Sequence, residues 1–360
     1  MKEAKTDPGA GGLCTALLDA LRAFEEAQRR YYPGIAPLLA ERFAPLRENL
    51  ERETKTLASP GVSAHDPGID RRLVEAAALC AEAFSSATEG DDFERAFINF
   101  LRASRRMARV KEMLFPLSEE VPAVNRFFLE QAVRDRAEQY VFPRESLPSG
   151  GLIHLGLDEH PYARGGCSIF VPRFEGHSGG LPLIMALHGG FGHGRDFIWT
   201  WIREARSRGF SVAAPSSLGN TWSITGGDVD AGLLARVLRY VMDRWPIDPG
   251  RILLTGISDG ATYALTRMME RDAPFSAYGP VAGVLPPFDL RFVRGRRICW
   301  IHGARDWMFP WQYAKAGAQR LAQAGADVTL RIVPDLYHAY PGEQNDGLLS
   351  WFDPGLALSP

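Results

Sequence analysis

Along most of the first 145 residues, apolar side chains recur every three or four positions, a spacing typical of amphipathic helices. The segment LLDALRAFEEAQRRYY puts Leu17, Leu18, Leu21 and Phe24 on one face before the break at Pro33-Gly34. Further helices are predicted at residues 36–58, with an interruption at Pro45, and after the breaks at 66–68, 90–92 and 118–120. Five helices with short connections predict an all-α bundle over residues 1–145, in which we find no catalytic motif.

The pattern changes after PRESLPSGG (Pro143–Gly151), which we interpret as a linker. Eight short β-rich runs follow: LIHLGL, CSIFVP, LPLIMALHGG, FSVAAPSS, RILLTGI, YGPVAGV, RICWIHG and VTLRIVP. Helical stretches separate most of them from Phe197 onward, whereas a short polar loop joins the first two. Residues 146–360 are therefore predicted to form a mostly parallel sheet of about eight strands, with helices on both faces and an antiparallel start.

Composition narrows the range of partners and compartments. The 360 residues are 46% hydrophobic and 23% charged, with a net charge of -2, so neither nucleic acid nor an anionic membrane is expected as a partner. The start MKEAKTDPGAGG lacks an apolar core, and the stretch from Leu13 to Phe24 contains Asp19 and Arg22. We therefore expect neither a signal peptide nor a membrane span, and a cytoplasmic location.

The cysteines give no sign of a metal site or a disulfide scaffold. Cys14, Cys80, Cys167 and Cys299 are far apart, and no pair has C-x-x-C spacing. We interpret all four as small buried apolar residues. No cofactor or metal is expected.

The strongest candidate for chemistry is Ser258, which lies in G-x-S-x-G between Gly256 and Gly260. The strand RILLTGI precedes it and the helix-forming run ATYALTRMMERD follows it. A strand–turn–helix context is what a nucleophile elbow requires, since the strained turn raises the serine above the sheet. A glycine–serine turn alone would need no such context, so we predict that Ser258 is a nucleophile.

A serine nucleophile needs a general base, and the base needs an orienting acid. Enzymes with this elbow have the chain order Ser, Asp or Glu, then His. His338 lies in the loop DLYHAYPG after the last predicted strand, and Asp306 follows the strand RICWIHG. We predict these two as base and acid, with Asp335 as the competing acid. His188 comes too early for the base and is interpreted as orienting its loop.

Acyl transfer also needs hydrogen-bond donors for the developing oxyanion. The loop ALHGGFGHG follows the strand LPLIMAL, and its glycines allow a close approach of backbone to substrate. We predict that the backbone N–H groups of Gly190 and Asp259 form the oxyanion hole, with Phe191 as the next candidate.

A family resemblance is carried by LHGG, PSSLGNTW, IDPGRILLTGISDGATYAL, IHGARDWMFP and the late His338. In order and spacing these motifs resemble an α/β-hydrolase of the carboxylesterase/phospholipase and dienelactone-hydrolase type over residues 150–345. The resemblance implies a serine esterase that needs no cofactor, and it does not cover the helical N-terminal region. Many lipases and peptidases of this fold carry a lid insertion between the strands YGPVAGV and RICWIHG, and this chain has none. We therefore expect the bundle to cover the site or to form a homo-oligomer contact.

Aromatic residues are frequent in the segments that should surround the site, which indicates an apolar or aryl pocket. We assign Phe191, Trp222, Trp307 and Tyr337 to substrate binding. The leading prediction is cleavage of small to medium apolar or aryl esters through an acyl-enzyme. A peptidase, a thioesterase or a polyester depolymerase would use the same triad, and a non-catalytic binding protein of this fold is the alternative from another class.

Overall fold

The structure is a computed structural model that describes residues 8–59, 66–90, 92–140, 151–156, 160–172 and 179–358. It divides into two compact units, which we call the helical unit (residues 8–130 and 134–140) and the sheet unit (residues 151–358, together with Gln131–Val133). The predicted linker Pro143–Gly151 lies outside the described residues apart from Gly151, which begins the first strand.

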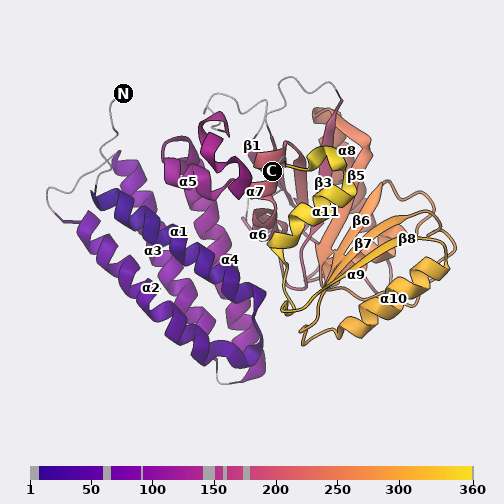
Figure 1. Ribbon diagram of the computed structural model, residues 1–360, viewed down its shortest axis with the longest axis horizontal. Helices are drawn as coiled ribbons and strands as arrows, with labels where there is room; N and C mark the ends of the chain where they lie inside the picture. Colours follow the sequence, from indigo (N-terminus) through magenta and orange to yellow (C-terminus); the bar gives the residue numbers. More distant parts are fainter. Residues whose placement is uncertain are drawn as a thin grey trace. The chain divides into compact units, whose positions relative to one another are not determined.

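The helical unit has four long helices that pack side by side (Figure 1). The elements are α1 (Pro8–Arg29), η1 (Pro33–Ile35), α2 (Ala36–Leu57), α3 (Pro67–Thr88), α4 (Phe93–Leu114), η2 (Phe115–Glu119), α5 (Pro122–Phe127) and η3 (Gln131–Tyr140). The Asp66 and Asp92 side chains cap α3 and α4 by accepting hydrogen bonds from Gly68 N and Arg95 N. Stacked aromatic rings fill the core, with ring centroids 4.3 Å apart for Phe43–Phe84 and 5.5 Å for Phe24–Phe100.

Two details of the predicted bundle are corrected. Helix α2 runs through Pro45 without interruption, because Pro45 is exposed and water can reach the carbonyl group that loses its partner there. Helix α5 ends at Phe127, and the chain continues after it in 3-10 geometry. Phe127, Phe128 and Leu129 are nevertheless all buried, so the apolar pattern marked the core correctly.

The sheet unit contains one sheet in the order β1-β2-β4-β3-β5-β6-β7-β8. The strands are β1 (Gly151–Leu155), β2 (Cys167–Val171), β3 (Leu181–Leu187), β4 (Ser211–Pro215), β5 (Ile247–Ile257), β6 (Ala277–Val281), β7 (Arg297–Gly303) and β8 (Asp327–Val333). Strand β2 is antiparallel to β1 and β4, and the other pairs are parallel. All eight predicted strands and the antiparallel start are confirmed.

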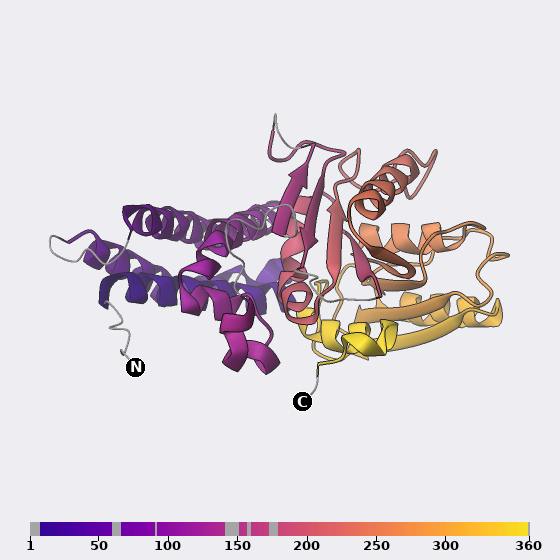
Figure 2. The same ribbon diagram turned by 90° about the horizontal axis from the view of Figure 1, so that it is seen from above.

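Helices cover both faces of the sheet. They are α6 (Gly194–Phe197), η5 (Ile198–Thr200), α7 (Ile202–Arg208), α8 (Ala231–Arg244), α9 (Asp259–Met268), α10 (Trp311–Gln323), η6 (Gly342–Gln344), α11 (Asn345–Phe352) and η7 (Pro354–Leu356). Leu183, Met185 and Leu187 of β3 pack with α8, α9 and α10 in one core. Figure 2 shows α8 and the yellow α11 on opposite sides of the sheet. Strands buried on both faces explain the nearly continuous apolar runs in the sequence.

This order, with helices on both faces and an antiparallel second strand, is the α/β-hydrolase fold. Its parallel strands bring their carboxyl ends to one edge of the sheet. The loops after β3, β5, β7 and β8 leave from that edge, and they carry Gly190, Ser258, Asp306 and His338.

Candidate active site

Ser258 sits in a strained turn between β5 and α9. Its φ of 55° and ψ of −117° lie in a region that residues other than glycine rarely adopt. The turn is held because the Ser258 N–H donates to the Val281 carbonyl at 2.9 Å, and Ser258 O accepts from Thr262 N. The serine is only 9% exposed.

The two glycines of the elbow are required by close backbone contacts. A Cβ on Gly260 would lie 2.4 Å from the His188 carbonyl oxygen, and one on Gly256 would lie 2.7 Å from the Gly260 carbonyl carbon. Both distances are shorter than atoms can approach, so the helix can start this close to the strand only with glycine at both positions. The small residues around Ser258 therefore bring β5, α9 and the β3 loop together.

The structure brings the three predicted triad residues into one hydrogen-bonded chain. His338 Nε2 lies 3.0 Å from Ser258 Oγ, and His338 Nδ1 lies 2.8 Å from Asp306 Oδ2. The carboxylate can only accept, so Nδ1 carries a proton and neutral Nε2 accepts from the serine hydroxyl. The alternative acid Asp335 is exposed on the same loop as His338, whereas the Asp306 side chain is fully buried.

The Asp306 carboxylate is held by its own loop as well as by His338. Its Oδ1 accepts from Met308 N at 2.9 Å and Phe309 N at 2.8 Å. Burial acts to raise the pKa of Asp306, but hydrogen bonds from His302, His338 and the Phe309 amide outweigh burial. The pKa of Asp306 therefore lies well below the usual range of an aspartic acid, and the group is a fixed anion facing His338.

The predicted oxyanion donors lie beside the nucleophile. A Cβ on Gly189 would be 3.6 Å from Ser258 Cβ, and one on Gly190 would be 2.6 Å from Asp259 Oδ2. Asp259 is the first residue of α9, so its N–H has no acceptor within the helix. Within the described part of the chain, neither the Gly190 nor the Asp259 N–H has a hydrogen-bond acceptor.

The backbone N–H of Phe191, the next candidate donor, already has a hydrogen-bond acceptor in another loop. Its N–H donates to the Asn220 carbonyl at 2.8 Å, which ties the β3 loop to the loop after β4. Phe191 is 64% exposed and its φ is 58°, and because its N–H is already hydrogen-bonded it presents its ring rather than its amide.

His188, the first residue after β3, uses its ring to bind the backbone of two loops. Its Nδ1 lies 2.7 Å from the Gly189 carbonyl oxygen, and its Nε2 accepts from Ser217 N at 3.1 Å. The His188 carbonyl accepts from Trp222 Nε1 at 2.8 Å. With both ring nitrogens bound to backbone, His188 orients the loop, as interpreted from the sequence.

Of the four aromatic residues assigned to the pocket, three have exposed surface and one is buried. Trp307 and Tyr337 are partly exposed near the base, with the Trp307 ring centroid 6.2 Å from that of His338. Phe191 is exposed beside Gly190. Trp222 is different, because it is 2% exposed and stacks on Tyr263 at 5.3 Å, so it has almost no surface to offer a substrate. Its place is beneath the β3 loop.

Three residues near the triad were given no specific site role from the sequence. Phe309 lies edge-on to His338 with ring centroids 5.3 Å apart, and the Thr221 hydroxyl donates to Asp259 Oδ2 at 2.5 Å. His302 Nε2 lies 3.3 Å from Asp306 Oδ2. Of these three residues, only His302 could have been noticed in the sequence, because it lies near the end of the strand that precedes Asp306.

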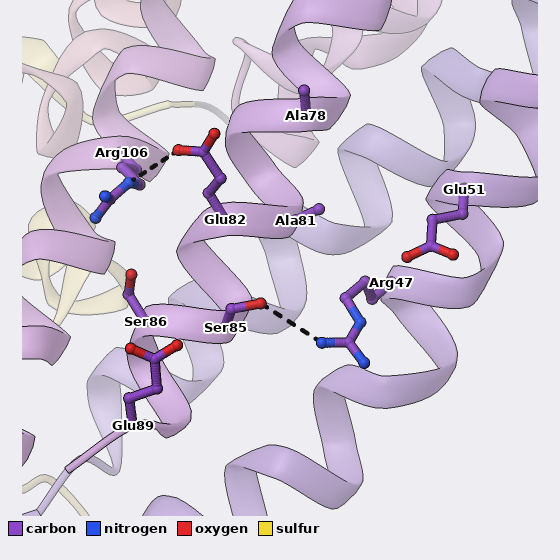
Figure 3. A pocket seen from close by; sticks show the side chains of 9 residues that line it. All are labelled: Arg47, Glu51, Ala78, Ala81, Glu82, Ser85, Ser86, Glu89 and Arg106. Atoms are coloured by element: carbon purple, nitrogen blue, oxygen red, sulfur yellow. Dashed lines mark hydrogen bonds and ion pairs between the residues drawn. The ribbon is translucent and has the colours of Figure 1, made fainter.

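The helical unit has a groove of about 470 Å³ between α2, α3 and α4 (Figure 3). Its walls carry charges of both signs, from Arg47, Arg106, Glu51, Glu82 and Glu89. Arg106 pairs with Glu82 at 3.4 Å, and Arg47 donates to Ser85 at 3.5 Å. This arrangement is typical of solvated helix faces rather than of a catalytic site.

Among the described residues, no group of three or more His, Cys, Asp or Glu side chains is arranged to hold a metal ion. None of the helices in that part of the chain combines the length and apolarity that crossing a bilayer requires.

No family model matches the chain. Among curated proteins, an acetylxylan esterase from Coprinopsis cinerea is 28% identical over 147 residues, covering 37% of this chain and 38% of that protein. The matched segment therefore spans well under half the length of this relative.

Similar solved structures include three esterases. A thermostable esterase has 19% identity and a TM-score of 0.45, covering 57% of this chain and 62% of its own. Esterase 2 of Thermogutta terrifontis has 16% identity and a TM-score of 0.45, covering 59% and 97%. A carboxylesterase of Bacillus cereus has 17% identity and a TM-score of 0.40, covering 49% and 92%. At such identities the likeness concerns the fold, which the strand order of the sheet unit already identifies as that of the α/β-hydrolases.

Proposed function

We propose that the chain is a serine hydrolase that cleaves carboxylic esters of small to medium apolar or aryl substrates. The observation that carries this proposal is the chain of hydrogen bonds from Ser258 through His338 to Asp306, with the serine on a strained elbow. A buried serine with a bound base and a fixed anion behind it is the arrangement that activates a hydroxyl for attack on an acyl carbon.

In the first half-reaction, Ser258 Oγ attacks the ester carbonyl carbon and its proton passes to His338 Nε2. The N–H groups of Gly190 and Asp259 donate to the oxyanion of the tetrahedral intermediate. When this intermediate collapses, the carbon–oxygen bond to the alcohol breaks and His338 returns the proton to the leaving oxygen. The product that stays behind is an acyl group on Ser258.

In the second half-reaction, water replaces the alcohol. His338 takes a proton from the water as its oxygen attacks the acyl carbon, and it then protonates Ser258 Oγ as the acid product leaves. Asp306 stays ionised throughout, because its pKa is low. It orients and stabilises the His338 imidazolium but does not accept its proton. No cofactor enters either step.

The preference for apolar substrates is supported by the rings beside the triad. Phe191 and Trp307 are exposed or partly exposed, and Phe309 and Trp307 lie against His338. An acyl or aryl group next to Ser258 would bury apolar surface against these rings, at roughly 25 cal/mol per Å².

The proposal is tested with p-nitrophenyl esters of increasing acyl length, alongside a thioester and an anilide of the same acyl group. We expect turnover of short and medium esters, with a pre-steady-state burst when deacylation is slower than acylation. Turnover confined to the thioester or the anilide would assign a thioesterase or a peptidase. Failure to turn over any of them would favour the non-catalytic alternative.

A further inference from the structure

The two-step mechanism leaves one fully buried histidine beside the triad without a role. His302 is 0% exposed and lies near the end of β7, four residues before Asp306. Its Nε2 is 2.8 Å from the Phe309 carbonyl oxygen and 3.3 Å from Asp306 Oδ2. Its Nδ1 is buried without a hydrogen-bond partner among the described residues.

These contacts define the protonation state of His302. A carbonyl and a carboxylate only accept, so Nε2 must carry a hydrogen that the Phe309 and Asp306 oxygens share. A second hydrogen on Nδ1 would be a buried donor without an acceptor and would place a positive charge in a fully buried side chain. His302 is therefore a neutral donor and not a second base.

Both oxygens of the Asp306 carboxylate therefore accept from donors other than His338. Oδ1 is occupied by the backbone N–H groups of Met308 and Phe309, whereas Oδ2 is shared by His338 and His302. A donor that draws on the negative charge of Oδ2 leaves less of that charge to hold the proton on His338. The same N–H ties the carbonyl of Phe309, whose ring lies against His338, to the end of β7.

We propose that His302 is a positioning residue that fixes Asp306 and Phe309 around His338 and, by sharing Oδ2, lets His338 release its proton at lower pH. The proposal rests on the proposed function of the same site. It assigns to His302 a specific electrostatic effect, which a residue that only fills space would not have.

Other titratable or charged groups lie on the segments that meet at His338. They are Arg305 on the β7 loop, Asp259 at the elbow, Asp335, Tyr337 and Tyr340 on the His338 loop, and Glu204 on α7, which interacts with Tyr340. A substitution at His302 leaves all of them in place, so a change in the pH profile reports on the His302 contacts.

The first test compares the pH dependence of kcat/KM in three variants. His302→Leu removes the donor, so the acidic limb should move to higher pH by about half a unit, and kcat should fall about 10-fold with little change in KM. His302→Gln retains an N–H at the corresponding position and should restore the limb. Ile301→Ala, a buried change on the same strand, should lower Tm without moving the limb.

An unmoved limb in His302→Leu, or an equal movement in Ile301→Ala, would reduce His302 to a packing residue. If His302→Leu does not fold, the His302→Gln profile is still informative, because any limb displaced upward in a folded variant that keeps the donor contradicts the proposal.

The second test reads the tautomer directly in the unmodified protein. With ¹⁵N-labelled histidines, and the His302 signals assigned by their loss in His302→Gln, we expect a ring protonated on Nε2 alone over the pH range of the activity profile. A cationic ring or an Nδ1–H tautomer in that range would overturn the proposal. This readout needs no turnover, so absent esterase activity would count against the proposed function and a wrong tautomer against the role of His302.

Discussion

The two units of the chain treat polar groups and backbone strain differently. In the helical unit, the core is aromatic and aliphatic, and Ser118 and Asn125 are the buried polar residues among those described. In the sheet unit, buried polar side chains include His188, His302 and Asp306, all at the carboxyl ends of strands. A core that only has to hold helices together does not need such groups, since each costs free energy unless it is hydrogen-bonded.

Backbone strain follows the same division. Outside glycine, the described residues with positive φ are Phe191, Ser258 and Ala282. They lie in the turns that follow β3, β5 and β6, and none lies in the helical unit. Among the described residues, non-glycine backbone strain and the buried His188, His302 and Asp306 therefore lie at the same edge of the sheet as Ser258 and His338.

Substitution of the buried acid should have the largest effect. Asp306→Asn keeps the shape of the side chain but removes the charge that holds His338, so kcat/KM should fall by about 10⁴-fold. The Asp306 pKa is lowered in the folded protein, so its ionised form adds stability above the unfolded pKa near 4, and this contribution is lost as pH falls toward the folded pKa. The Tm gap between wild type and variant should be widest above about pH 5 and should close in acid. A gap independent of pH would contradict this assignment.

A core substitution in the helical unit should change stability without changing catalysis. Phe24→Ala empties a site that is 1% exposed and stacked on two other rings, and should cost about 3–5 kcal/mol. The measurement is denaturant unfolding together with kcat/KM per folded molecule, which should stay within about 2-fold of wild type. A larger fall would give the helical unit a part at the site, as the prediction of a lid requires, whereas an oligomer contact would show in the molecular mass of the wild type in solution.

Two glycine substitutions test the contrast at the level of the backbone. Gly260→Ala forces a Cβ to 2.4 Å from a carbonyl oxygen and should destabilise by about 1–3 kcal/mol while reducing activity. Gly11→Ala, in α1 with no atom within 4 Å of the new Cβ, should stabilise by about 0.5–1 kcal/mol. Calorimetry of both variants checks the opposite signs. Equal effects would mean that the elbow is no tighter than an ordinary helix.

The smallest expected effect concerns the cysteines. All four are buried, and burial raises the pKa of the Cys14 and Cys299 thiols to about 11 and those of Cys80 and Cys167 above their usual range. We expect no labelling by iodoacetamide in the native protein and four labels after unfolding. Rapid labelling of a single thiol in the native state would reveal local opening around that cysteine.

Much of the fold could be predicted because period and length are local signals. Each of the eight apolar runs corresponds to a strand in the structure, and the alternation of strands with helices correctly predicted a mostly parallel sheet. The triad grouping followed from chain order and strand ends, since the carboxyl ends of parallel strands meet at one edge. The predicted interruption at Pro45 was wrong. The free-energy cost of a proline inside a helix depends on exposure and packing, which the local sequence pattern does not report.

Other features depend on loops that meet only in three dimensions. Trp222 and Trp307 look alike in sequence, yet one is buried under the β3 loop and the other is partly exposed beside His338. The Phe191 amide is occupied by a carbonyl from a different loop. The sequence shows a histidine near the end of β7, but the contact between His302 and Asp306 depends on how the β7 loop folds back on its strand. The predicted lid or oligomer role of the helical unit stays a prediction.

The central claim, that Ser258 is an activated nucleophile, is tested most directly by covalent labelling with a fluorophosphonate and mass spectrometry of the labelled peptide. We expect one label per chain, located on Ser258, lost in Ser258→Ala with an unchanged Tm, and much slowed in Asp306→Asn. A label on another residue, or labelling that persists in folded Ser258→Ala, would contradict it.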